Sequence, residues 1–288
     1  MTDATFLSRQ ERFAQVGSTN DVVRDWLAAG TSEVCLALAD EQTAGRGRDG
    51  RTWVGRPGSA MLLSLGFRPT WLAPKHVWRL PALVSLAMAD AAEEVAGLAD
   101  QAIRLKWPND LVIEDAGAAG SRSAAAAPGA ESTTDRPDAI RKLAGVLGET
   151  TGLGTSDPTA VVGIGINADW PRAEFPADLA GTMTSLRDAS GGRPVDLGAL
   201  LDAFLSRLEP RVLALRGGRF PVSDWIDRQL TTGRLVDLAR PDGSIEQVQA
   251  IGVDVDSGGI VVADVSAPLG ERTVTVGEIV RLRIAVGV

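Results

Sequence analysis

A glycine- and arginine-rich segment lies between two apolar, strand-like runs, and this arrangement constrains the fold more than any other feature of the chain. The segment is Glu41–Trp53 (EQTAGRGRDGRTW), and the runs are Val34–Ala39 and Met61–Phe67. Glycines let the backbone adopt positive φ or approach a ligand closely, and arginines supply planar donors for phosphate or carboxylate. Because a strand holds each end, the segment is predicted to be an anion-binding loop. By itself, the composition is equally typical of a mobile linker or a nucleic-acid arm.

Three other short segments combine polar, chemistry-bearing residues with strand-like surroundings. Leu105–Ile113 reads LKWPNDLVI, Lys142–Glu149 reads KLAGVLGE, and Val162–Asn167 reads VGIGIN. In the first, Pro108 favours an extended residue before it and a turn after it, which directs the Asn-Asp pair toward one site. The alternative is an ordinary surface turn, since Asn and Asp are common in turns.

In this order, and behind Ser18-Thr19-Asn20, these segments resemble the catalytic domain of the biotin protein ligases, also called holocarboxylase synthetases. The resemblance covers roughly residues 12–286 and rests mainly on KWPND in combination with the upstream GRGRDGR. It implies an α+β fold, with a mixed-sheet catalytic domain like that of class II aminoacyl-tRNA synthetases and a small C-terminal SH3-like β-barrel.

The resemblance also implies an activity and its substrates. We expect an ATP-dependent ligase that forms biotinyl-5′-AMP and transfers biotin to a specific lysine of a biotin carboxyl carrier protein domain, as found in acyl-CoA and pyruvate carboxylases. Biotin, ATP and Mg²⁺ would be its substrates and cofactor. Two alternatives remain open, namely a lipoate or octanoate ligase of the same superfamily and a non-catalytic sensor of biotinyl-AMP.

Activation of a carboxylate at the α-phosphate of ATP requires cations, because negative charge is dispersed as pyrophosphate leaves. By resemblance, the reactive cations are Arg48, Lys106 and Lys142, and for each lysine the alternative is a solvated surface residue. Asp110 resembles an essential aspartate of the family, and the resemblance implies a role at Mg²⁺. It acts through the metal or as a base, and the residues do not choose between these roles.

The remaining site residues are also implied by the resemblance. Those expected to bind biotin are Ser18, Thr19, Asn20, Gln42, Gly45, Arg46, Gly145, Leu147, Gly163 and Ile166. Those expected at ATP or the adenylate are Arg46, Arg48, Arg51, Trp53, Asn109, Lys142 and Asn167. For Ser18 the structural alternative is a helix N-cap. Gly163 and Gly165 are too small to pack well in a strand, which predicts a ligand lying against them, with a β-bulge as the alternative.

Periodicity and composition divide the chain. Residues 1–231 are predicted to form the catalytic domain, and the alternating pattern of residues 232–288 predicts the small barrel. Residues 115–139 are rich in Ala, Gly, Ser and Pro, which predicts a disordered insertion in a hairpin. Helices are expected at residues 21–30, His76–Ala96, Leu197–Leu215 and Val222–Leu230. Strands are expected at residues 11–16, Ile103–Trp107, Leu111–Glu114, Leu143–Glu149 and Ala160–Asn167.

Charge and cysteine content limit the class of protein. The 29 Lys and Arg against 37 Asp and Glu give a net charge of -8, which argues against general nucleic-acid binding. Because few residues precede Ser18, we expect no helix-turn-helix domain. The single cysteine, Cys35, excludes an internal disulfide and is expected to pack in the core. With no long apolar run and no signal core, we expect a cytoplasmic protein without a membrane partner. We also expect a monomer or a weak homodimer.

Overall fold

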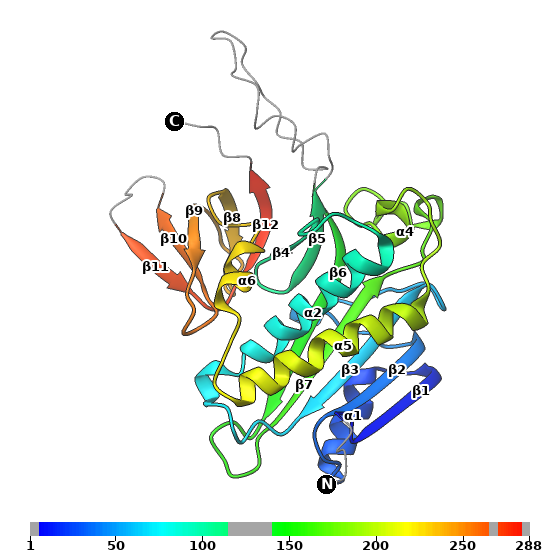
Figure 1. Ribbon diagram of the computed structural model, residues 1–288. Coiled ribbons are helices and arrows are strands. Elements are labelled where there is room, and N and C mark those ends of the chain that lie inside the picture. The colour runs from blue at the N-terminus through cyan, green and yellow to red at the C-terminus, as the bar shows by residue number, and fades with distance from the viewer. Residues whose placement is uncertain (1–5, 115–139, 265–269, 284–288) are drawn as a thin grey trace.

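The computed structural model describes residues 6–114, 140–264 and 270–283, and they form two β-sheets with helices (Figure 1). The predicted insertion at 115–139 lies outside the described residues. The larger sheet has seven strands in the order β1-β2-β3-β7-β6-β5-β4. Its strands are β1 (Arg9–Val16), β2 (Cys35–Gln42), β3 (Ala60–Phe67), β4 (Ile103–Lys106), β5 (Asp110–Glu114), β6 (Ile140–Thr151) and β7 (Thr159–Asn167). Because β1 pairs parallel to β2 and the other pairs are antiparallel, the sheet is mixed, as predicted.

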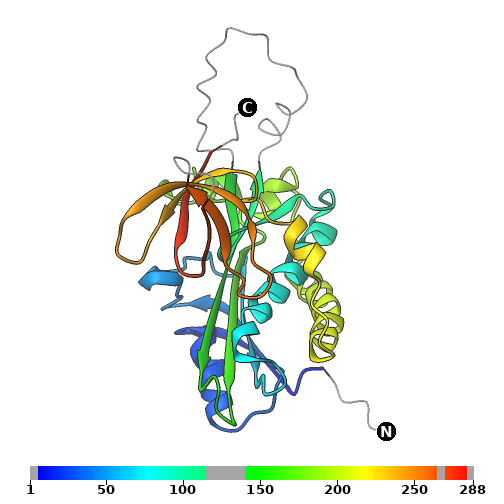
Figure 2. The ribbon, with the colours of Figure 1, turned by 90° about the vertical axis from the view of Figure 1, so that its left-hand side faces the viewer.

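One face of this sheet carries the main hydrophobic core. Helices α2 (Arg79–Ala96) and α5 (Leu197–Arg216) pack over it as an outer layer (Figure 2). Strand β3 is buried along its whole length, which explains why its sequence, AMLLSLGF, is nearly continuous in apolar residues. The core joins alternate residues of β3 and β7 to the apolar sides of both helices.

The opposite face is covered at one end by α1 (Thr19–Ala28). Its Val23 and Leu27 pack with Cys35 and Val161 in a smaller apolar cluster. Cys35 is fully buried, and burial raises the pKa of its thiol above the ordinary value. The prediction that this cysteine is a core residue is therefore confirmed. The rest of this face is open for the site described below.

The second sheet has five antiparallel strands in the order β11-β10-β9-β8-β12, which confirms the small SH3-like unit. They are β8 (Leu235–Ala239), β9 (Ile245–Val253), β10 (Ile260–Asp264), β11 (Glu271–Val274) and β12 (Glu278–Arg283). Trp107, from the KWPND turn, is only 5% exposed and belongs to the core of this sheet. Its indole N–H donates to the carbonyl of Gly258 at 3.2 Å. The exact boundary at residues 231 and 232 stays a prediction.

Two predicted helices are shorter than expected. Residues Pro74–His76 form the 3₁₀ turn η2, so α2 begins at Arg79. Helix α6 (Val222–Asp227) ends before Leu230 because the chain turns to run beside β4. There the backbone N–H of Leu105 donates to the carbonyl oxygen of Arg228. The backbone N–H of Leu230 donates to the carbonyl oxygen of Leu105, and both distances are 2.8 Å. Two smaller elements are η5 (Arg172–Glu174) and α4 (Leu186–Ala189). Across the described ranges, no helix combines the length and apolarity needed to span a membrane.

Candidate active site

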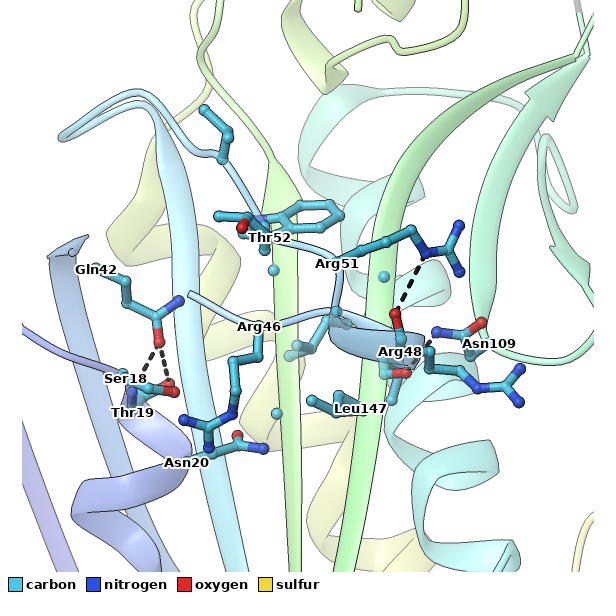
Figure 3. A pocket seen from close by; sticks show the side chains of 18 of the residues that line it. Ser18, Thr19, Asn20, Gln42, Arg46, Arg48, Arg51, Thr52, Asn109 and Leu147 are labelled. Carbon is cyan, nitrogen blue, oxygen red and sulfur yellow. Dashed lines mark hydrogen bonds between the residues drawn. The ribbon is translucent and has the colours of Figure 1, made fainter. Parts of the chain in front are cut away.

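A cavity of about 250 Å³ opens on the face of the large sheet that α2 and α5 leave uncovered (Figure 3). It lies between the start of α1, strands β6 and β7, and the loop formed by the glycine- and arginine-rich segment Glu41–Trp53, here called the glycine loop. The lining residues are Ser18, Thr19, Asn20, Gln42, Arg46, Gly47, Arg48, Arg51, Thr52, Trp53, Val54, Leu63, Asn109, Lys142, Gly145, Val146, Leu147, Gly163, Ile164, Gly165, Leu179 and Met183. Segments far apart in sequence therefore meet around one hollow, as the motifs predicted.

The polar end of the cavity is a chain of hydrogen-bonded groups, which are buried except for the partly exposed Gln42. The backbone N–H of Thr19 donates to Gln42 Oε1 at 2.7 Å, and the Thr19 hydroxyl lies 3.0 Å from the same oxygen. Thr19 Oγ1 is also 2.7 Å from Ser64 Oγ, and the Ser64 hydroxyl donates to Asn20 Oδ1 at 2.6 Å. Ser18 stands at the N-cap position of α1, but its side chain makes no capping hydrogen bond. Ser18 therefore occupies the N-cap position, as the structural alternative predicted, but its hydroxyl does not cap the helix.

The strand glycines leave space for side chains of the protein itself. A Cβ atom on Gly163 would lie 2.2 Å from Asn20 Oδ1, and one on Gly165 would lie 2.4 Å from Trp53 Nε1. The pairing of β3 with β7 continues through both glycines without a shift, so the bulge interpretation is wrong. In this structure, Asn20 and Trp53 occupy the places where the sequence predicted a ligand.

The glycine loop is folded, and each of its arginines meets an acceptor. Arg46 pairs across the loop with Thr52, and the 3₁₀ turn η1 (Arg48–Gly50) forms its tip. The Arg46 guanidinium contacts Asp21, while Arg51 Nη1 donates to Glu278 Oε1 at 2.8 Å. Arg48 Nη1 donates to the carbonyl of Gly277 at 3.1 Å. Mutual repulsion of the three cations is thereby offset, and two of them tie the loop to the second sheet.

The charged residues expected to react lie where this cavity adjoins a second one. Lys142 Nζ is 2.6 Å from Asp110 Oδ1. Lys106 and Asp110 line the second cavity, of about 340 Å³, which lies between the two sheets. It shares Arg48, Asn109, Val146 and Leu147 with the first. Burial lowers the pKa of Lys106, although the nearby carboxylates of Asp110 and Glu278 act in the opposite direction. The predicted cations are thus divided between two adjoining hollows.

Asp110 is the residue available for a metal ion. Its Oδ1 is buried and makes no hydrogen bond of good geometry with any described residue, despite the nearby lysine. Within the described ranges, no three His, Cys, Asp or Glu side chains gather as a metal site. One carboxylate beside several cations suits Mg²⁺ that arrives bound to ATP phosphates, since Mg²⁺ commonly takes only one or two protein carboxylates.

Three predicted positions differ in the structure. Ile166 has no exposed surface and packs in the main core, because alternate residues of β7 face opposite sides of the sheet. Asn167 is fully buried beyond the cavity and donates through Nδ2 to the carbonyl of Thr184 at 3.0 Å. Gly45 does not line the cavity; its carbonyl accepts from the Trp53 N–H at 3.0 Å, and an added Cβ would lie 2.7 Å from the Trp53 carbonyl oxygen. Gly45 therefore allows the loop to close on itself.

Other residues were missed by the sequence analysis. Ser64 gave a usable signal, since it is the one polar residue within an apolar strand. Leu179 and Met183 line the cavity from a segment without recognisable periodicity, where Met183 bridges to Lys142. Trp170 stacks on Phe175 with ring centres 4.3 Å apart, in an apolar cluster that also contacts Trp53.

Comparisons with known proteins agree with this geometry. The model of the biotin/lipoate A/B protein ligase family matches residues 13–167, more than half of the chain. The chain is 30% identical to biotin--[acetyl-CoA-carboxylase] ligase of Mycobacterium tuberculosis, over 94% of this chain and 88% of that protein. It is 28% identical to the bifunctional ligase/repressor BirA of Bacillus subtilis, over 68% of this chain and 51% of BirA.

Among solved structures, the fold is similar to that of the biotin protein ligase from Aquifex aeolicus in complex with biotin and ATP. The TM-score is 0.71 at 22% identity, and the match covers 97% of this chain and all of the other. Because the family model matches more than half of the chain, the chain is a protein ligase of the biotin/lipoate A/B family. Within that family it is a biotin protein ligase, as the similarity along nearly its whole length shows.

Proposed function

We propose that the protein activates biotin with MgATP to form biotinyl-5′-AMP and then transfers biotin to a lysine of a biotin carboxyl carrier protein domain. The observation that carries this proposal is the position of the Lys142–Asp110 pair, between a cavity with a polar end and a second cavity that holds Lys106. In the first step, a biotin carboxylate oxygen attacks the α-phosphorus and pyrophosphate leaves. In the second, the lysine amine attacks the acyl carbon, and AMP and a proton are released.

The residues divide this work by position. The chain from Gln42 through Thr19 and Ser64 to Asn20 offers donors and acceptors for the ureido ring of biotin, and Leu147 with Met183 supplies apolar walls. Lys142, Arg48 and Lys106 would stabilise charge on the phosphates. Asp110 would orient Lys142 and meet the Mg²⁺ bound to ATP, and Asn109 would hold the turn by donating to Val146 O at 2.9 Å.

The test is a reconstituted reaction. The protein is incubated with biotin, MgATP and a carrier domain from an acetyl-CoA or pyruvate carboxylase, and both pyrophosphate release and the mass of the carrier are followed. We expect one biotin per carrier lysine and no modification with lipoate or octanoate. Preferential use of lipoate or octanoate would instead identify a ligase for that acid, and binding of biotinyl-AMP without turnover would identify a sensor.

The other partner assignments are also proposals. With a net charge of -8, the protein lacks the excess of cations that nucleic-acid binding requires, so we propose that it does not bind DNA. Titration with DNA from upstream of biotin synthesis genes, at low salt with biotin and ATP present, tests this; saturable nanomolar binding would refute it. We further propose that the protein is cytoplasmic and that it is a monomer or a weak dimer. Sedimentation at several protein concentrations tests the oligomeric state.

A further inference from the structure

Four charged side chains of alternating sign gather where the glycine loop meets helix α1 and the end of β6. The carboxylates belong to Asp21 and Glu149 and the guanidinium groups to Arg24 and Arg46. Arg46 donates to both oxygens of Asp21 at 2.8 Å each, and Arg24 donates to Asp21 at 2.6 Å and to Glu149 at 2.8 Å. Arg46 also lies 3.5 Å from Glu149. We call these four residues the charge cluster.

The contact between Arg46 and Asp21 is the strongest kind of pair available to an arginine. A bidentate guanidinium–carboxylate pair fixes the orientation of the side chain as well as its position. The hydrogen bond from Arg46 holds the pKa of Asp21 below its ordinary value, so the carboxylate stays charged at neutral pH. In Figure 3, Arg46 extends from the loop toward Asn20 at the start of α1.

The glycine loop covers the first cavity, and the part of the loop that lines the cavity begins at Arg46. The residues of this part of the chain that line the cavity are Arg46–Arg48 and Arg51–Val54. The N–H of Gly47 donates to Arg51 O at 2.7 Å, and Arg46 bridges to Thr52, so the two limbs of the loop move together. A restraint on Arg46 therefore also restrains Trp53, whose indole lies against Gly165 on the floor of the cavity.

We propose that Asp21 is a positioning residue that keeps the loop closed over the cavity by holding Arg46. Asp21 does not itself line the cavity, so it acts on ligands through Arg46. A closed loop slows the escape of biotin and of its acyl-adenylate. The chemical step depends less on Asp21, because the Lys142–Asp110 pair lies outside the loop and Arg48 keeps its own contact with the carbonyl of Gly277. The inference rests on the proposed ligase function for its kinetic part only.

The test compares Asp21→Asn with Asp40→Asn. Asp40 is a matched control because it pairs with Arg12 at 2.6 Å on the edge of the sheet and has a similar exposed fraction, 38% against 42%. Without ligand, we expect trypsin to cleave after Arg48 and Arg51 about threefold to tenfold faster in Asp21→Asn, since a partly exposed pair contributes modestly. With ATP saturating, the KM for biotin should rise by a similar factor of about three to ten, while kcat changes less than about twofold.

A double variant tests whether Asp21 acts through Arg46. If it does, Asp21→Asn combined with Arg46→Gln has the same cleavage rate and KM as Arg46→Gln alone. Additive effects would overturn the proposal, as would an Asp21→Asn variant that matches Asp40→Asn in both measurements. Should Asp21→Asn fail to fold, Arg46→Lys removes the bidentate contact and must open the loop. Proteolysis needs no reaction, so a wild-type protein that forms no adenylate refutes the proposed function but not the loop assignment.

Discussion

Lys142 Nζ lies 2.6 Å from Asp110 Oδ1, across the pairing of strands β5 and β6. The carboxylate is 13% exposed and the lysine 29% exposed, so each charge partly offsets the burial of the other. The pair joins two motifs that are separated in sequence by the predicted insertion. It is the point at which the two cavities meet.

We expect Lys142→Ala and Asp110→Ala each to slow biotinyl-AMP formation by about 10²- to 10³-fold, because a preorganised charge at the reacting groups is lost. The fold should survive, since neither side chain belongs to a hydrophobic core. Pyrophosphate release measures the rate, and thermal unfolding checks the fold. Lys75→Ala is the control, because its pair with Asp256 is exposed and neither residue lines either cavity. Near wild-type rates in both variants would reject the assignment.

Lys106 gives a pH prediction. Burial lowers its pKa below the ordinary 10.5. Only the ammonium form can stabilise phosphate charge, so activity is present below the lowered pKa and is lost as pH rises through it. The alkaline decline of adenylate formation should therefore begin below pH 10.5 in the wild type and move to higher pH in Lys106→Arg, because arginine does not titrate there. An unchanged decline in Lys106→Arg, with Lys75→Arg as control, would show that another group titrates.

The strand glycines predict that the effect of a Gly→Ala substitution on biotin binding depends on its position. A methyl group on Gly165 would collide with Trp53 at 2.4 Å, and one on Gly163 would collide with Asn20 at 2.2 Å. Gly165→Ala and Gly163→Ala should therefore displace these side chains and weaken biotin binding by about tenfold or more, as measured by calorimetry. Gly148→Ala on β6 is the control, because its nearest neighbour, Pro81, would be 3.6 Å away. Equal affinities across all three variants would contradict the assigned contacts.

The insertion prediction concerns residues outside the described part of the chain. Glu114 and Ile140, which flank residues 115–139, face each other in the β5–β6 register. A short linker can therefore join the strands, and we expect replacement of residues 117–137 by a short Gly/Ser linker to leave biotinylation of the carrier within about twofold of wild type. A folded variant that forms biotinyl-AMP but no longer biotinylates the carrier would show instead that the insertion takes part in transfer.

Local sequence patterns predicted most of the architecture. Periodicity located the strands and most of the helices, because alternation and the 3.6-residue repeat are properties of neighbouring residues. The motifs also located the loop, the KWPND turn and the GIGIN strand. Ile166 was assigned to the wrong face of the sheet, because the face that a residue occupies depends on how its strand pairs. The end of α6 was placed too late, because the chain after this helix runs beside β4.

The details of the site needed the tertiary structure. Trp107 sits within a recognisable motif, yet only the fold places it in the core of the second sheet, 151 residues from its partner Gly258. Asp21 and Arg46, or Glu149 and Arg24, are ordinary charged residues until the fold brings them together. The sequence by itself determined the elements, the family and the reactive residue types, since these follow from short-range pattern. Which charges pair, which side chains fill the glycine positions, and how the loop is held were decided only by long-range contacts, because no local pattern records which distant residue becomes a neighbour.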